Sequence, residues 1–147
     1  RSRGVLGEAA DAVGVIRERW GAMLAHGAQT CWEEFGGSGS PWEMYGRRFG
    51  KSLTHGWSAG PAALLPELVL GIRPIGAGWR TFSVEPALGE LDWASAVVPT
   101  PHGDIVVRAD AVETTVDVPS GTALVVSEGQ FRGPVMVRRV GDGWQVL

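Results

Sequence analysis

The chain has 147 residues, enough for one domain of ordinary size or two small ones. Hydrophobic residues make up 44% and charged residues 20%, which indicates a folded protein rather than a disordered one. A net charge of −3 without a basic patch argues against nucleic-acid binding, and no apolar run approaches the ~20 residues of a membrane-spanning helix. A single cysteine, Cys31, excludes an intrachain disulfide and a multi-cysteine metal site. We therefore expect no nucleic-acid or membrane partner, no metal and no other cofactor.

The first predicted element is a helix over residues 5–24. Its apolar residues recur at spacings of three and four and form one stripe: Leu6, Ala9, Val13, Ile16, Trp20 and Met23. Gly14 costs this helix roughly 1 kcal/mol relative to alanine, so the helix depends on packing against other elements. Gly27 is expected to end it.

A glycine- and serine-rich loop over residues 36–40 precedes a second predicted helix, at 41–48. Ser40 is a favoured N-cap, Pro41 is favoured at the first helical position, and Glu43 stands where a capping box requires an acid.

A third helix is predicted over residues 52–70. One stripe is apolar (Leu53, Trp57, Leu64, Leu68) and another is small or polar (Ser52, His55, Ala59, Ala62). A helix with two such faces is suited to lining a cavity. Pro61 and Pro66 should kink it or split it near Gly60, and Gly71 and Pro74 should end it.

After Gly76-Ala77-Gly78 the hydrophobic period changes to two, which indicates strands. We predict strands at 79–85, 92–98, 104–109, 112–118, 123–127, 134–140 and 143–147. Turn residues rich in proline and glycine separate several of them, as in an antiparallel β-sandwich. The predicted class is α+β, with helices over residues 1–75 and an antiparallel sandwich over 76–147.

The segment with the clearest chemical potential surrounds Glu33. Glycoside hydrolysis needs one carboxylic acid to protonate the leaving oxygen and a second carboxylate to activate water or attack directly. Among the glutamates of the helical half, Glu33 is the best candidate because it follows Trp32 in a glycine-bounded stretch, where loops present catalytic groups. The alternative is an ordinary solvated glutamate.

His55 lies two residues before Trp57 and is a candidate hydrogen-bond donor to a sugar hydroxyl. Aromatic rings such as those of Trp32 and Trp57 can stack on the C–H faces of sugars. The alternative is a structural histidine with one backbone partner.

Two other functions fit parts of the sequence. Cys31 and His55 could form the nucleophile–base pair of a cysteine hydrolase, although no known nucleophile signature surrounds Cys31. The β half could instead be a noncatalytic carbohydrate-binding or structural β-sandwich module. Its tryptophans at 79, 93 and 144 could stack on sugar, although such residues more often belong to a core.

The order of motifs resembles the bacterial α-L-rhamnosidase family of glycoside hydrolases over roughly residues 1–110. The matching features are a helix followed by Thr30-x-Trp32-Glu33, Ser52-x-x-His55, Gly71-Ile72-Arg73-Pro74, Gly78-Trp79-Arg80, Leu91-Asp92-Trp93-Ala94 and the turn at 98–103.

This resemblance implies the end of a six-hairpin (α/α)6 barrel, closing near Leu70, followed by a C-terminal β-sandwich. It also implies inverting hydrolysis of terminal α-L-rhamnosides. Glu33 matches the general base of the family's Thr-x-Trp-Glu motif, with Glu34 as the near alternative. His55 matches a histidine that contacts the bound rhamnose.

The chain departs from the family pattern in one important respect. The family's general acid and most of its sugar-stacking tryptophans lie upstream of the matched region, outside this chain. We therefore expect the chain alone to be incomplete and inactive, with the rest of the barrel in another chain or an upstream segment, or with the exposed face covered by a second copy. Its rhamnoside substrate follows only from the resemblance, and its localisation stays open.

Overall fold

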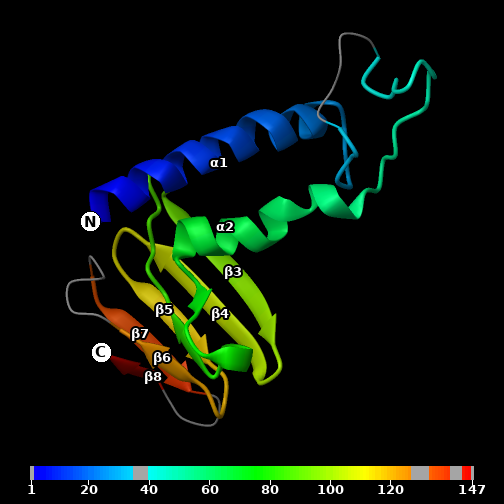
Figure 1. Cartoon of the computed structure of the whole chain (residues 1–147). Helices are drawn as coiled ribbons and strands as arrows, with labels where there is room; N and C mark the ends of the chain where they lie inside the picture. Colours follow the sequence, from blue (N-terminus) through cyan, green and yellow to red (C-terminus); the bar gives the residue numbers. More distant parts are fainter. Residues whose placement is uncertain (1, 35–39, 127–132, 140–143, 147) are drawn as a thin grey trace. The chain divides into compact units, whose positions relative to one another are not determined.

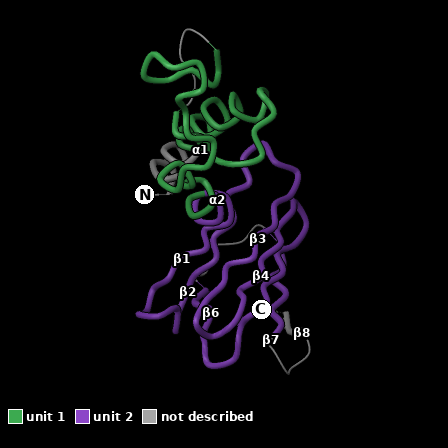
Figure 2. The backbone as a smooth tube through the Cα atoms, turned by 90° about the vertical axis from the view of Figure 1, so that its right-hand side faces the viewer, with its two compact units in different colours: residues 1–64 green, residues 65–147 purple. Residues whose placement is uncertain are grey.

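A computed structural model describes residues 2–34, 40–126, 133–139 and 144–146 (Figure 1). Apart from Ser40, the predicted loop at 36–40 lies outside the described residues. The chain forms two compact units, Arg1–Leu64 and Leu65–Leu147 (Figure 2). Two α-helices come first and two small sheets follow, so the predicted α+β class is confirmed. Within the described residues, neither helix is long and apolar enough to cross a membrane.

Helix α1 spans Ser2–Ala25 and confirms the first predicted helix. Met23 is buried at its C-terminal end, and the Trp20 Nε1–H donates to the Ser58 carbonyl oxygen at 2.7 Å. Gly27 ends the helix in the left-handed conformation, at φ +81°. The Ala28 amide then donates back to the Met23 carbonyl oxygen at 3.0 Å, which satisfies a carbonyl that the helix leaves free.

The helix predicted at 41–48 is wrong. Ser40 begins a turn, since its Oγ accepts from the Trp42 amide at 3.4 Å and its carbonyl oxygen accepts from the Glu43 amide at 2.9 Å. The chain then reverses at Tyr45, which has φ +54° and lies outside the right-handed helical region. Ser40 therefore accepts hydrogen bonds as a helix N-cap would, but the chain continues as a single turn rather than as a helix.

The helix predicted at 52–70 is correct only in its second half. The 3-10 turn η1 spans Gly56–Ser58, and helix α2 spans Gly60–Leu70, so the predicted split near Gly60 is present. Residues 52–55 are not helical because their backbone groups pair with the segment that follows α1: the His55 amide, for example, donates to the Cys31 carbonyl oxygen at 2.8 Å.

The described strands form two sheets, and their bounds agree with the predicted strands to within a few residues. The first sheet has the order β1 (Arg73–Pro74), β2 (Thr81–Ser83) and β6 (Ala123–Val125). The second has the order β3 (Trp93–Thr100), β4 (Gly103–Asp110), β5 (Thr114–Val118), β7 (Val135–Arg139) and β8 (Trp144–Val146). The sequence analysis does not predict strand β1, because it assigns Gly71 and Pro74 to the end of the preceding helix. A second 3-10 turn, η2, spans Ala77–Trp79 before β2.

The prediction of a purely antiparallel arrangement is wrong. Strand β2 pairs with β6 in parallel, and β5 pairs with β7 in parallel, so both sheets are mixed. The chain between the partners of each pair is long enough to return to the strand's starting end, which a short hairpin turn does not permit.

The core of the second unit follows the alternation that the sequence predicts. Strand β4 buries alternate residues, among them Ile105 and Val107, and β5 does the same with Val116 and Val118. Phe82 of the first sheet is 0% exposed. Each such side chain contributes about 1.5–3 kcal/mol when it leaves water.

Candidate functional site

The two strongest candidate residues lie on segments that are joined by backbone hydrogen bonds. The Glu33 amide donates to the Ser52 carbonyl oxygen at 2.9 Å, and the His55 amide donates to the Cys31 carbonyl oxygen at 2.8 Å. The Thr30 hydroxyl also donates to the Leu53 carbonyl oxygen. The structure therefore brings together the Thr30-x-Trp32-Glu33 motif and the segment that ends at His55, within unit Arg1–Leu64.

The half-buried carboxylate of Glu33 accepts a hydrogen bond on each of its oxygens. Oε2 accepts from the Ser52 amide at 3.0 Å, and Oε1 accepts from the Tyr45 hydroxyl at 3.2 Å. One donor belongs to the backbone of the paired segment and the other to a nearby turn. Because the two donors approach different oxygens, they fix the orientation of the carboxylate plane.

Tyr45 is a site residue that the sequence analysis missed. The negative charge of Glu33, and then the hydrogen bond to it, raise the pKa of the Tyr45 phenol above its ordinary value of 10.0. Partial desolvation and the charge of Glu34 act in the same direction. The phenol therefore stays protonated, and remains a donor, throughout the neutral range. Gly46 was the only local signal, since glycine is unfavourable in a helix interior and common in turns; nothing local pointed to Tyr45 itself.

His55 and Trp57 form a mixed aromatic pair. Their ring centroids lie 4.6 Å apart with 43° between the ring planes. Trp57 is 80% exposed, whereas His55 is half-buried. An exposed indole face beside an imidazole supplies both kinds of contact that a sugar requires, an apolar surface and a hydrogen-bonding group.

Trp32 has different surroundings from Trp57. It is only 5% exposed, so its ring is buried. This burial favours a role in fixing the backbone at Glu33, and direct sugar contact by Trp32 stays a prediction.

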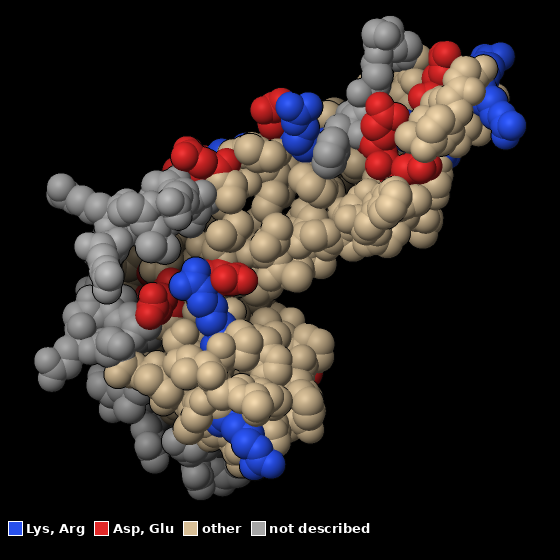
Figure 3. Space-filling model, viewed as in Figure 1, with Lys and Arg blue, Asp and Glu red and all other residues tan. Residues whose placement is uncertain are grey.

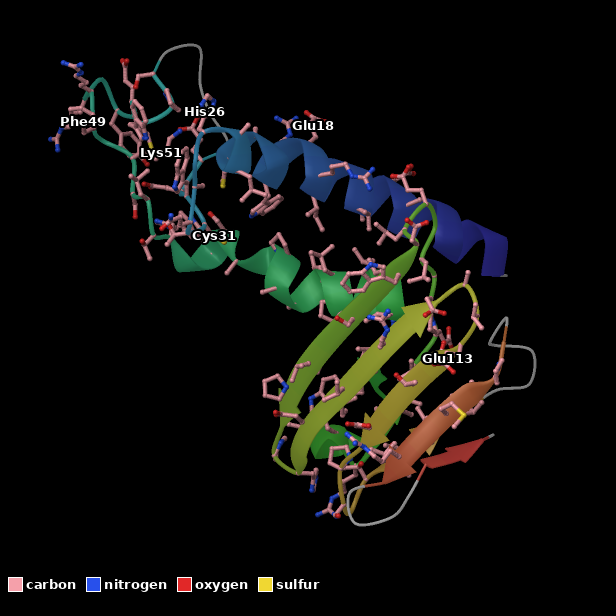
Figure 4. The ribbon with its side chains drawn as sticks, turned by 180° about the vertical axis from the view of Figure 1, so that it is seen from behind. Glu18, His26, Cys31, Phe49, Lys51 and Glu113 are labelled. Atoms are coloured by element: carbon pink, nitrogen blue, oxygen red, sulfur yellow. The ribbon has the colours of Figure 1, made fainter. Side chains whose placement is uncertain are left out.

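Two further reactive side chains follow α1 and can be located in Figure 4. Cys31 is a free, half-buried thiol, and its described link to His55 runs through backbone groups rather than through the thiol. Lys51 is 7% exposed, and its Nζ has no hydrogen-bond partner among the described residues. In the part of the chain that the structure describes, no three His, Cys, Asp or Glu side chains gather closely enough to hold a metal.

Charge does not single out one ligand class. On the face drawn in Figure 3, acidic and basic side chains are interspersed among uncharged ones. In the segment around the candidate site, Glu43 is exposed, and so are Arg47 and Arg48, whose guanidinium lies 5.3 Å from the centroid of the Phe49 ring.

Comparison with known proteins finds a family-model match in the β-rich unit. Residues 71–130 match the model of the bacterial alpha-L-rhamnosidase C-terminal domain. These residues make up most of the β-rich unit. This match confirms the resemblance that the sequence suggested. No curated protein sequence is similar enough to this chain to count as a match.

A solved structure extends the similarity to the helical part. The crystal structure of the GH78 family rhamnosidase of Bacillus sp. GL1 matches 86% of this chain at 31% sequence identity, with a TM-score of 0.68. The chain spans 14% of the length of that rhamnosidase. The similarity thus includes residues outside the C-terminal domain match but only a small part of that rhamnosidase.

Proposed function

We propose that this chain is the C-terminal portion of an inverting glycoside hydrolase acting on terminal α-L-rhamnosides, in which Glu33 is the general base. The observation that carries the proposal is the oriented Glu33 carboxylate, held between the Ser52 amide and the Tyr45 hydroxyl on a segment paired with that of His55. The similarity to a GH78 rhamnosidase supports the same assignment.

The chemistry follows from the requirements of inversion. A water molecule attacks the anomeric carbon as the bond to the leaving oxygen breaks, and a general acid gives its proton to that oxygen. Glu33 takes the proton from the attacking water. Each carboxylate oxygen has two lone pairs, so Oε1 can accept from Tyr45 and still bind this water. The acid should lie roughly 6.5–9.5 Å from Glu33 to leave room for the water.

Substrate binding is assigned to the aromatic pair. His55 would hydrogen-bond a rhamnose hydroxyl, and the exposed ring of Trp57 would stack against an apolar face of the sugar. The buried Trp32 would fix the backbone next to Glu33. Stacking and hydrogen bonds of this kind position the substrate and lower KM, whereas the base acts on the chemical step.

The same proposal assigns different structural roles to the two parts of the chain. Residues 1–75 would supply helices and loops of an (α/α)6 barrel, and residues 76–147 a supporting β-sandwich. The general acid and the rest of the barrel would come from another chain or an upstream segment, consistent with the chain spanning 14% of the matched rhamnosidase.

The test compares two neighbouring carboxylates in the full-length protein that carries this chain, with p-nitrophenyl α-L-rhamnoside as substrate. Glu33→Gln should lower kcat by about 10²–10⁴-fold, which is the usual contribution of a general base. Glu34→Gln is the matched control and should retain most activity. Loss in Glu34→Gln alone would move the base by one residue. A wild-type protein that binds rhamnosides without hydrolysing them would favour the noncatalytic alternative.

A further inference from the structure

Tyr45 has a backbone conformation that a bulky residue rarely adopts. Its φ is +54°, and that of Gly46 is +69°, so two successive residues lie in the left-handed region. Met44 and Arg47 flank them and exchange two backbone hydrogen bonds, at 3.0 and 3.1 Å. This is a two-residue hairpin of the type I′ class, in which the first central position favours Asn, Asp or Gly over an aromatic residue.

The surrounding chain is shaped to hold this turn. A Cβ atom at Gly50 would collide with the Met44 carbonyl oxygen, so the chain can fold back against the turn only because residue 50 is glycine. The Lys51 amide then donates to the Trp42 carbonyl oxygen at 3.3 Å and closes the loop. A left-handed conformation costs a non-glycine residue roughly 1–2 kcal/mol. Such local strain is often found where a side chain has a function.

The side chain of Tyr45 supplies that function. The residue is 75% exposed, so apolar burial does not explain a tyrosine at this position. Its hydroxyl instead donates to Glu33 Oε1 at 3.2 Å. Among the described residues, the charged groups that act on this phenol are Glu33 and, more weakly, Glu34.

We propose that Tyr45 is a positioning residue for the general base, presented by the strained turn so that its hydroxyl fixes Glu33 Oε1 toward the attacking water. The inference rests on the proposed role of Glu33. The Ser52 amide fixes Oε2, and Tyr45 fixes the other oxygen, so the two donors together determine where the free lone pair of Oε1 points. Phenylalanine at position 45 would keep the ring and the turn but leave the carboxylate held at one oxygen.

The pairing can be tested without any activity measurement. Tyr45 is the only tyrosine in the sequence, so ultraviolet titration of tyrosinate in this chain reports on Tyr45 alone. Glu33→Gln removes the main cause of the raised pKa, and the pKa of Tyr45 should fall toward 10.0. Glu34→Gln is the matched control: the charge of Glu34 raises the pKa of Tyr45 least, so its removal should change that pKa much less. Identical titration curves for wild type and Glu33→Gln would overturn the pairing.

The positioning role is tested in the full-length protein with the same p-nitrophenyl substrate. Tyr45→Phe should lower kcat about 3- to 10-fold with KM unchanged, because one exposed hydrogen bond to a charged group is lost. Phe49→Leu removes another exposed ring from the same loop and should leave both unchanged.

The outcomes separate the two proposals. If Glu33→Gln retains activity, the proposed role of Glu33 as general base fails, and the positioning role fails with it. If Glu33→Gln loses activity while Tyr45→Phe keeps the wild-type kcat and KM, only the positioning role is overturned.

Discussion

The β-rich unit and the segment between α1 and α2 are built on different principles. In the β-rich unit, many equivalent apolar contacts repeat along paired strands, and no single residue defines the fold. Residues 26–34 and 40–59 contain little regular structure and depend on individual hydrogen bonds, such as those from the Glu33 amide and the His55 amide. This segment also leaves Tyr45 and Trp57 exposed. The β-rich unit is stabilised by many similar contacts. The irregular segment instead presents individual polar and aromatic side chains.

The comparison implies that substitutions in the two regions affect different properties. A change in the β-rich core should lower the free energy of unfolding without touching any candidate site residue. A change in the irregular segment should affect chemistry first and stability second. Binding and catalytic groups commonly lie on loops for this reason, because a loop can orient a polar side chain that a packed sheet would bury.

The largest effect on stability is expected at the centre of the β-rich unit. Phe82→Ala should lower the free energy of unfolding by about 3–5 kcal/mol, because the substitution leaves a cavity at a fully buried position. Urea unfolding followed by tryptophan fluorescence would measure it. Val97→Ala, at an exposed position of β3, is the control and should change stability by less than about 0.5 kcal/mol. Equal effects would mean that Phe82 is not a core residue.

A smaller effect is expected from a pair of glycines in the same unit. Gly71 and Gly78 both have positive φ, +61° and +66°. A Cβ at Gly71 would also lie 2.6 Å from the Glu85 backbone nitrogen, whereas no atom of the described residues lies within 4 Å of one at Gly78. Gly78→Ala should therefore lower the free energy of unfolding by only roughly 1–2 kcal/mol, the cost of a left-handed non-glycine residue. Gly71→Ala should lower it clearly more, because its Cβ also collides with Glu85. The same urea titration tests this, and the reverse order would contradict the structure.

A change of the opposite sign is expected at Lys51, in the irregular segment, where substitution should be stabilising. A buried ammonium without a hydrogen-bond partner is costly, and methionine has a similar length without the charge. Lys51→Met should raise the free energy of unfolding of the chain by about 1–3 kcal/mol. Arg47→Met, at an exposed position of the same segment, is the control and should have little effect. A destabilised Lys51→Met protein would show that the ammonium has a partner.

The sequence predicted most of the β-rich unit and only part of the irregular segment. Alternation and turn residues locate strands because each strand carries its own pattern, and β3 and β4 lie where the pattern placed them. The partner of a strand is not encoded locally, so the parallel pairs of β2 with β6 and of β5 with β7 were missed.

Of the candidate site residues, too, the sequence predicted some and missed others. Glu33 and His55 could be singled out from a motif, because each stands in a recognisable local context. Tyr45 could not, since its bond to Glu33 spans 12 residues and depends on a strained turn. The helix predicted there failed because Ser40 and Glu43 describe only how a helix could begin, whereas Tyr45 and Gly46 reverse the chain.

The central claim, that Glu33 is the general base, is tested most directly by replacing the base chemically. In the full-length protein, Glu33→Ala should lose hydrolysis of p-nitrophenyl α-L-rhamnoside, because no group remains to take the proton from water. Azide is an anion that needs no deprotonation, so adding it should restore p-nitrophenol release and yield rhamnosyl azide with the inverted anomeric configuration. Glu33→Ala with wild-type hydrolysis in the absence of azide would contradict the claim.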